Sequence, residues 1–467
     1  MRIRQIHILA LKWHAILQNM KKMKTVWVIS IISFSLLAGT VEHSRKVWTL
    51  NDCIRFAMQN NISVQKVEVE ARLASEDLQQ SKRNLLPSVG ISSGAGYSFG
   101  RSIDPNTNLI VNNQFFNSNF QVGASMPVSG GFLMIRQIEY QKFRQKAAEL
   151  NRLSVMDDLA FQVMGAYFEV MYYEGLLKIA GQQVETSALN LKKVEKQVGL
   201  GMKSMTDLYD MRANYEAEEL RRIQTENRLT SVNLELKQLM NLTDTARLML
   251  KRDSLAEMTP AIPDGQLMVS YFLDWSPVVQ SFATQLKLSK KQLSISRSML
   301  YPSVNLNGSV GSGFYETNKD NAGRTIGFRS QFNNNLNQFF GASVSVPVFY
   351  RWSRRSDISK AKMQVEQAQN RLDEQKQKAY FEIENSKNEL VAFEKEHSQY
   401  KKQIEADRLA FQATEKKLEQ GMISVADFYI AKNRLAQTES QVLASRLQWE
   451  IRKKALDFYM GKRFWEE

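Results

Sequence analysis

The sequence predicts a mainly α-helical fold with a smaller β-barrel part, built by tandem duplication of one unit. Three observations support this prediction. Short motifs recur at a spacing of about 220 residues. Long stretches carry apolar residues at the spacing of a coiled coil, and four further segments alternate between apolar and small polar residues. The 467 residues therefore divide into an amino-terminal segment and two copies of one unit.

The amino-terminal segment, residues 1–40, is predicted to be a secretory signal, and its first 19 residues are expected to be an upstream extension. An apolar run at 26–38 follows three basic residues, Lys21, Lys22 and Lys24. This run is short for a permanent membrane anchor. Thr40 stands where a lipoprotein carries its cysteine, so we expect cleavage near residues 38–42 and no lipidation.

Composition and charge argue against a nucleic-acid partner. Lysine and arginine number 62 against 48 aspartate and glutamate, which gives a formal net charge of +14. Six of the basic residues lie in 1–40, and the others alternate with acids along predicted helices, as at 394–396. Such alternation is typical of a solvated helix face rather than of a phosphate-binding stripe.

Residues that carry chemistry are scarce. Cys53 is the single cysteine, which excludes an intrachain disulfide and a cysteine-rich zinc site. Only His43 and His397 follow the signal, and no nucleotide-binding glycine loop or Ser/His/Asp spacing is present. The sequence therefore predicts no enzyme, no cofactor and no metal site.

Two pairs of matching motifs define the duplication. Residues 201–209 recur at 421–429, an offset of 220, and residues 86–89 recur at 301–304, an offset of 215. The difference places five additional residues in the second copy, in a stretch where an exposed loop is expected. The first repeat, a connecting segment and the second repeat are predicted at 41–241, 242–270 and 271–467.

Four segments are expected to form strands, each of about ten to thirteen residues with one apolar and one small polar face. Aromatic pairs near their ends favour a transmembrane β-barrel with lipid outside and water inside. The alternative is a soluble antiparallel sheet with one wet face. The expected strands span about 88–100 and 115–128 in the first repeat, and about 303–315 and 335–348 in the second.

Long helices are expected over most of the remaining chain. Residues 163–198 and 383–418 place apolar side chains at alternating spacings of three and four over five heptads, which is typical of a coiled-coil seam. Each repeat is predicted as helix, strand, loop, strand, very long helix, sharp turn and long helix. The long helices are expected at about 132–200 and 204–241, and at about 353–420 and 424–461.

The two sharp turns share the motif Gly-x-x-Ser-x-x-Asp, at Gly201, Ser204 and Asp207 and again at Gly421, Ser424 and Asp427. The glycine is expected to end the rising helix with a positive φ, and the serine and aspartate are expected to form a capping box. A simple helical hairpin explains these residues. The duplication also places both turns about 100 Å from the strands, which makes them the expected docking end.

Taken together, the motifs make the sequence similar to the TolC-like outer-membrane efflux family over about residues 47–461. The resemblance rests on the opening at 48–54, the paired strand starts, Val-Pro-Val at 346–348 and the duplicated turns. It implies a homotrimer, in which each protomer gives four strands to a twelve-stranded barrel in the outer membrane of a Gram-negative bacterium and its helices to a periplasmic α-barrel. Outer-membrane lipid is then a partner, and threefold closure removes the open sheet edges that lipid does not tolerate.

The same resemblance implies the exit duct of a tripartite export system, which passively conducts substrates delivered by a periplasmic adaptor and an inner-membrane pump. Two alternatives remain, namely the outer-membrane duct of a type I protein-secretion system and an exported coiled-coil protein without a pore. The resemblance places the adaptor contact at the turns, at Leu200, Gly201, Met202, Lys203, Ser204, Gly421, Met422 and Ser424. It places the gate near Asp207 and Asp427. Known gates often have a second acid three residues after the aspartate of the second turn, but this chain has Ile430 there and Asp210 in the first turn. Asp207, Asp210 and Asp427 are therefore expected to form an acidic gate, where carboxylates would favour cations.

Four methionines gather in the sequence around the turns, at Met202, Met205, Met211 and Met422. We interpret them as an adaptable apolar surface for a partner helix. The alternative is handling of a soft metal, which histidine or cysteine would be expected to support. Neither residue type accompanies this group in the sequence.

Overall fold

The computed structural model describes residues 47–103, 108–112, 114–243, 248–251, 258, 264–463 and 465. The predicted signal and most of the predicted connecting segment lie outside this part. The chain forms two compact units, and both predicted repeats belong chiefly to the larger one, Thr49–Arg247 with Arg252–Glu467. In the smaller unit, strand β1 (Val47–Trp48) pairs in parallel with β6 (Met249–Leu250).

In the first repeat, two helices stand where one was expected. They are α2 (Leu50–Asn60) and α3 (Ile62–Arg83). Asn61 separates them because its backbone is extended, with φ −67° and ψ 130°, and its side chain accepts a hydrogen bond from the Ser63 amide. This Asn N-cap begins α3. The remaining main elements are β2 (Ser88–Ser98), β5 (Phe115–Gly130), α4 (Leu133–Gly199) and α5 (Met205–Met240).

The loop of the first repeat contains a short hairpin that the sequence analysis did not anticipate, formed by β3 (Arg101–Ile103) and β4 (Ile110–Asn112). Gly100, with φ 105°, turns the chain between β2 and β3. The expected strand over 88–100 therefore ends at Ser98. Only glycine adopts such a backbone conformation without strain.

The second repeat begins earlier than expected, because α6 (Gly265–Trp275) starts inside the predicted connecting segment. Pro277 opens the next helix, α7 (Pro277–Ser298), as the first helical residue, where its missing amide hydrogen costs nothing. The other elements are β7 (Ser303–Tyr315), α8 (Phe328–Asn334), β8 (Asn337–Ser345), α9 (Ser353–Glu419) and α10 (Val425–Tyr459).

The strand expected over 335–348 is shorter in the structure, at Asn337–Ser345, and helix α8 fills part of the loop before it. This short helix stands there because its aromatic side chains pack on a strand. The rings of Phe328 and Phe332 lie edge-on to Phe120 of β5, with centroids 5.9 and 5.8 Å apart.

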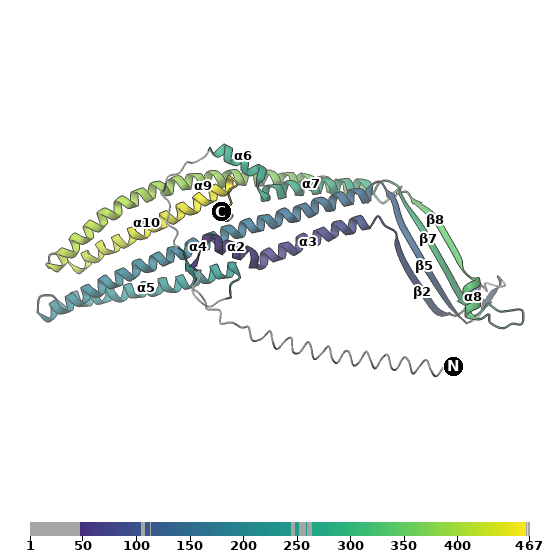
Figure 1. The fold of residues 1–467 in the computed structure, drawn as a ribbon, viewed down its shortest axis with the longest axis horizontal. Helices are drawn as coiled ribbons and strands as arrows, with labels where there is room; N and C mark the ends of the chain where they lie inside the picture. Colours follow the sequence, from purple (N-terminus) through teal and green to yellow (C-terminus); the bar gives the residue numbers. More distant parts are fainter. Residues whose placement is uncertain are drawn as a thin grey trace, which may run out of the picture. The chain divides into compact units, whose positions relative to one another are not determined.

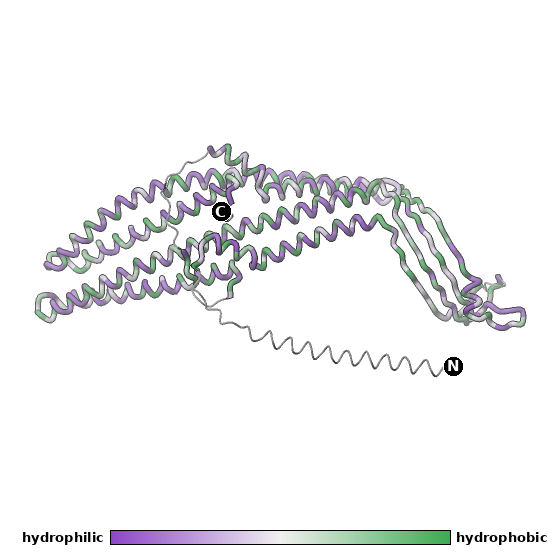
Figure 2. The backbone as a smooth tube through the Cα atoms, in the orientation of Figure 1, coloured by the Kyte–Doolittle hydropathy of each residue, from purple (hydrophilic) through white to green (hydrophobic). Residues whose placement is uncertain are grey.

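One antiparallel sheet joins the two repeats, with strand order β2-β5-β7-β8. Ile91, Val122 and Val310 lie opposite one another on three neighbouring strands and are all exposed, which gives one face an apolar surface. Along the strands the residues alternate in hydropathy (Figure 2). Among the described strands, β2 and β8 each pair on one side only, so both long edges of this sheet are open.

Helices α4 and α9 each run for 67 residues, which is about 100 Å at 1.5 Å per residue. Each reverses at a sharp turn and packs along its return helix, α5 or α10. The predicted seams are confirmed, because their positions from Val163 to Val198 and from Ile383 to Leu418 are all buried or half-buried. In the larger unit, the turns lie at the ends of these helices remote from the sheet (Figure 1).

Among the described helices, none combines the length and the apolar character that crossing a bilayer requires.

The second seam contains a buried histidine that makes stability depend on pH. The Nδ1 atom of His397 on α9 lies 3.0 Å from Ser445 Oγ on α10. Burial lowers the pKa of His397, and the charges of Lys401 and Arg446 lower it further. His397 therefore takes up a proton more readily in the unfolded chain than in the folded one. Its contribution to the free energy of unfolding is complete above the ordinary histidine pKa of 6.5 and is lost as the pH falls from there toward the lower pKa of the folded state.

We predict that His397→Gln reduces this acid sensitivity. Between neutral pH and a pH of about 5, the wild-type chain should lose more free energy of unfolding than the variant, because only the wild type has the buried His397 to protonate. Urea denaturation followed by circular dichroism at each pH measures both losses. Equal losses in the two proteins would contradict the assignment.

Candidate functional site

The candidate site is the pair of turns that join α4 to α5 and α9 to α10. In the first turn the Gly201 amide donates to the Val198 carbonyl at 2.9 Å, and the Met202 amide donates to the Gln197 carbonyl at 2.8 Å. This is the Schellman pattern, which needs a left-handed residue, and Gly201 supplies it with φ 74°.

The second turn repeats this geometry. The Gly421 amide donates to the Leu418 carbonyl at 3.0 Å, and the Met422 amide donates to the Lys417 carbonyl at 2.9 Å. Gly421 has a φ of 71°. A Cβ atom added to either turn glycine would meet no heavy atom within 4 Å, so backbone conformation rather than space requires glycine there.

Both predicted capping boxes are confirmed. The Ser204 hydroxyl accepts from the Asp207 amide at 3.1 Å, and the Asp207 carboxylate accepts from the Ser204 amide at 3.3 Å. Ser424 and Asp427 make the same pair of bonds at 3.1 and 3.3 Å. The two aspartates therefore have a structural task in starting α5 and α10, whatever else they do.

The surface of the turns is apolar at its most exposed points. Leu200, Met202 and Met422 are 75%, 71% and 68% exposed. Lys203 is half-buried, whereas Ser204, Ser424 and the two turn glycines are exposed. Met211 does not belong to this surface, because its side chain is fully buried, so the predicted group of four methionines is divided.

The predicted acids differ in their surroundings. Asp207 is half-buried, whereas Asp210 and Asp427 are exposed. The carbonyl of Asp210 accepts a hydrogen bond from Asn214 Nδ2 at 2.8 Å. Within the described part of one protomer, no three acidic, histidine or cysteine side chains converge in a manner suited to a metal ion.

One apolar cluster packs the two turns together. Its buried members come from four helices and are Val194, Met211, Leu418, Val425, Phe428 and Tyr429. The ring of Phe428 lies 5.7 Å from that of Phe411, centroid to centroid. The ends of the two helical hairpins are therefore one packed body, in which a change at one turn reaches the other through buried side chains.

A buried polar cluster next to the turns was missed by the sequence analysis. Lys432 of α10 is only 1% exposed, and its Nζ lies 2.7 and 2.9 Å from the carboxylate oxygens of Glu218 on α5. The same amine donates to the Ser187 hydroxyl and the Gln183 carbonyl on α4, at 2.5 and 2.6 Å. One cation thus links three helices from both repeats.

The second hairpin carries a related cluster at the matching heptad position. Asp407 stands 220 residues after Ser187, and both are polar residues in seams whose other members are mostly apolar. The Asp407 carboxylate accepts from Thr438 Oγ1 at 2.8 Å and pairs with Arg434 Nε at 2.8 Å. A polar residue at a seam position was the available signal for both clusters.

Burial dominates the electrostatics around Lys432. It lowers the pKa of the Lys432 amine, against the opposing effect of the hydrogen bonds and charge of Glu218. Burial also raises the pKa of the neighbouring Tyr429 phenol, and the Glu218 charge adds to this effect. The charged amine therefore depends on its carboxylate partner, because a lone buried cation is strongly unfavourable.

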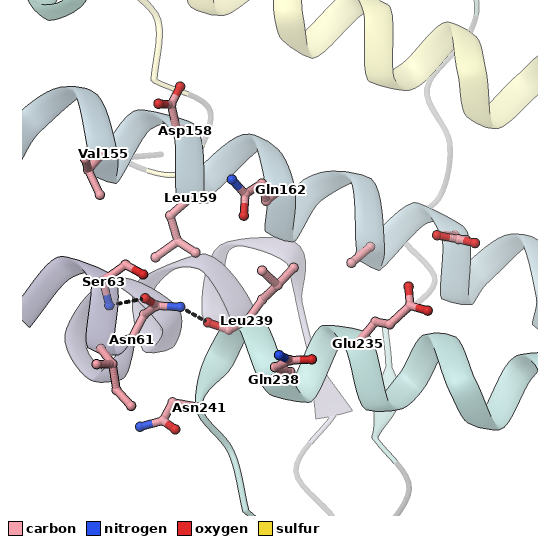
Figure 3. A pocket seen from close by; sticks show the side chains of 13 residues that line it. Asn61, Ser63, Val155, Asp158, Leu159, Gln162, Glu235, Gln238, Leu239 and Asn241 are labelled. Atoms are coloured by element: carbon pink, nitrogen blue, oxygen red, sulfur yellow. Dashed lines mark hydrogen bonds between the residues drawn. The ribbon is translucent and has the colours of Figure 1, made fainter.

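A cavity of about 910 Å³ lies elsewhere in the larger unit, between the α2–α3 break and helices α4 and α5 (Figure 3). Asn61 lines it and donates to the Leu239 carbonyl at 2.7 Å. Asp158 also lines it, and burial raises the pKa of this carboxyl. The lining residues include no cysteine or histidine, and no predicted site residue lies there.

Comparison with known proteins decides the family. The sequence model described as "Outer membrane efflux protein" matches residues 53–242 and 269–462. The chain belongs to this family of outer membrane efflux proteins. The two matched stretches coincide closely with the two repeats, so the resemblance stated from the motifs is confirmed. The family is one of transport proteins rather than of enzymes.

Known relatives match over nearly their whole length. The outer membrane protein TolC of Salmonella enteritidis is 20% identical over 451 residues, covering 95% of this chain and 87% of the relative. TolC of Vibrio cholerae is 21% identical over 440 residues, covering 92% and 93%. The crystal structure of the Campylobacter jejuni CmeC outer membrane channel superposes with a TM-score of 0.77 at 14% identity, covering 89% and 86%. The predicted fold class is thereby confirmed for the single chain.

The buried ion pair yields a stability prediction. Glu218→Ala should lower the free energy of unfolding by about 3–5 kcal/mol, because it leaves the Lys432 amine buried without its carboxylate. Combining Glu218→Leu with Lys432→Met should recover most of this loss, since two apolar side chains leave no unpaired charge. Glu219→Ala on the same helix is the matched control, because Glu219 pairs with Arg222 where both side chains are only half-buried.

Urea denaturation of the purified variants measures these differences. A Glu218→Ala protein as stable as the Glu219→Ala control would contradict the importance of the buried pair.

Proposed function

We propose that the protein is the exit duct of a tripartite export system, acting as a homotrimer in the outer membrane with its helices in the periplasm. Each protomer would contribute four strands to a barrel of twelve and two helical hairpins to a tunnel. The channel would be passive, and an inner-membrane pump joined through a periplasmic adaptor would supply the energy.

The main support for this proposal is that both edges of the sheet are open. Strands β2 and β8 each present one row of backbone groups with no partner strand among the described residues. Water could satisfy these groups, but the exposed apolar face of the same sheet argues for lipid. In lipid every backbone group needs an internal partner, so the sheet must close. Pairing β2 of one protomer with β8 of the next closes it by threefold symmetry.

Exposed apolar residues on the helices support the same assembly. Leu189, Leu234 and Leu409 lie on α4, α5 and α9 and are each more than half exposed in the single chain. Exposed apolar side chains on long helices are typical of helix–helix contacts. In a trimer, neighbouring protomers would cover them.

The turns are the proposed docking end and entrance. Leu200, Met202 and Met422 offer flexible apolar surface that a helical hairpin of an adaptor can cover. The adaptor contact would also include Gly201, Lys203, Ser204, Gly421 and Ser424. The exposed carboxylates of Asp210 and Asp427, with the capping Asp207, would make the entrance acidic when repeated three times.

The trimer is tested by crosslinking across the proposed seam. Ile91→Cys in β2, combined with a cysteine at successive positions of β8, should give covalent trimers under oxidation in at least one register. The control pair Gln121→Cys and Gly311→Cys lies on the paired strands β5 and β7 and should crosslink only within one chain. The purified protein should also give single-channel conductance in a planar bilayer. A soluble monomer without conductance would overturn the proposal.

The turns are tested by backbone changes. Gly421→Pro should abolish export while leaving the trimer in the membrane, because proline cannot adopt φ 71° and cannot donate the hydrogen bond that the Gly421 amide makes to the Leu418 carbonyl. Gly201→Trp should act similarly by straining the first turn and covering the docking surface. Gly199→Ala is the matched control, since its added Cβ meets no heavy atom within 4 Å and its φ is negative.

Export is measured as tolerance of a toxic substrate in cells that depend on the channel, and the trimer by its migration with and without heating. Normal tolerance in Gly421→Pro would count against the turns as the docking end.

A further inference from the structure

All four helix–strand connections of the sheet meet one of its ends (Figure 1). There α3 leads into β2, β5 into α4, α7 into β7, and β8 into α9. Basic residues are concentrated at this junction, whereas the same stretches, 80–87, 131–144, 290–301 and 349–358, contain only two acids, Glu139 and Asp357. The basic residues are Lys82, Arg83, Arg136, Lys142, Arg144, Lys290, Lys291, Arg297, Arg351, Arg354 and Arg355.

Several of these basic residues are already engaged within the chain. Lys291 pairs with Glu139 at 2.7 Å, and Arg144 pairs with Asp77 at 2.9 Å. Arg136 donates to the Ser294 carbonyl at 2.8 Å, which ties α4 to α7. The arginines before and at the start of α9 differ, because among the described residues none of Arg351, Arg354 and Arg355 lies within ion-pair distance of a carboxylate.

The duplication shows that Arg351 is not required by the turn itself. Arg351 and Trp352 have left-handed backbones, with φ 48° and 62°. The matching positions of the first repeat are Gly131 and Phe132, both with φ 62°. A glycine suits this conformation and an arginine does not, so the second repeat retains a cationic side chain at a conformationally unfavourable place.

Aromatic rings hold two of the guanidinium groups. The guanidinium carbon of Arg355 lies 4.3 Å from the centroid of the Trp352 ring, and that of Arg354 lies 5.3 Å from the centroid of the Tyr350 ring. Stacking fixes a guanidinium plane while leaving its N–H groups available at the edge. Nη1 of Arg354 contacts Met299 Sδ at 3.0 Å, whereas its Nε is buried and has no partner among the described residues.

An apolar cleft adjoins these arginines. It has a volume of about 170 Å³ and is lined by Leu300, Pro347 and Val348 together with the aromatic and arginine side chains. Val348 is 90% exposed, and Phe349 beside it is also exposed. Fixed cationic donors therefore lie next to an uncovered apolar surface that continues toward the strands.

We propose that this arginine–aromatic junction binds the phosphate of an anionic membrane phospholipid, with an acyl chain lying against Val348 and Phe349. The inference rests on the proposed function, because strands that cross the membrane place the junction at the level of the headgroups. Aromatic residues favour that level, and basic clusters there attract anionic lipid. Paired donors of a guanidinium match the geometry of a phosphate.

The site is tested on the full-length trimer purified in detergent. Native mass spectrometry counts the bound lipid after titration with phosphatidylglycerol or with phosphatidylcholine that has the same acyl chains. The shift in melting temperature is measured separately with phosphatidylglycerol and with inorganic phosphate. The wild type should retain phosphatidylglycerol in preference to phosphatidylcholine. The double variant Arg354→Gln with Arg355→Gln should bind it at least tenfold more weakly, and the single exposed variant Arg355→Gln should be intermediate.

The matched control is Arg329→Gln on α8, an exposed arginine at the opposite end of the sheet, which should bind like the wild type. Equal binding by the double variant and the wild type would overturn the inference. Equal binding of phosphatidylcholine by the wild type would also overturn it, because the site would then not select an anionic headgroup. A thermal shift by inorganic phosphate as large as that by the lipid would overturn it as well, because the site would then not need a lipid.

Conductance separates this inference from the proposed function. A wild-type trimer that conducts but shows no preference for anionic lipid would refute the lipid site alone. A protein that neither forms a trimer nor conducts in any bilayer would refute the proposed function. The double variant should remain a conducting trimer, because the two replaced arginines contact lipid rather than the pore.

Discussion

The open edges of the four-stranded sheet are the constraint on which the rest of the structure depends. A backbone amide or carbonyl that faces lipid without a partner is strongly unfavourable, and β2 and β8 each present a row of them. The duplication supplies four strands in one chain, which is too few to close a sheet with its polar face enclosed. On the proposed function, closure comes from other copies of the chain, and the long helices that continue from these strands would follow the same symmetry.

Duplication also explains why the two hairpins share their turns but differ in their polar contacts. The capping boxes at Ser204 and Ser424 are local, so each copy keeps them independently. The contacts of the seam residues Ser187 and Asp407 are not local, because their partners lie on other helices. In the first copy this position joins a cation of the second hairpin, whereas in the second copy it pairs within its own hairpin. The two hairpins are therefore linked asymmetrically.

The sequence was sufficient for features whose cause is periodic or local. Heptads defined the seams, and a three-residue spacing defined the caps. The break at Asn61 was missed because a lone asparagine in an amphipathic stretch is a weak signal, and α8 was missed because its aromatic residues depend on Phe120 across the sheet. The pairing of Lys432 with Glu218 spans 214 residues of sequence, so no local pattern could predict it. The arginines of 351–355 were considered only as part of the overall net charge, and net charge does not show that they have no acidic partner among the described residues.

If the protein is the proposed duct, the Lys432 cluster opposes separation of the two helical hairpins. The turns themselves are stabilised by caps that survive any rigid movement of a hairpin, whereas the contacts from Lys432 to α4 and α5 break if α10 moves away from them. Separating the hairpins therefore leaves a buried amine in need of water or a new partner. An adaptor can shift this equilibrium only through tighter binding to the separated arrangement than to the packed one. Exposed residues such as Met202 and Met422 can provide that difference only if the surface they offer changes when the hairpins separate.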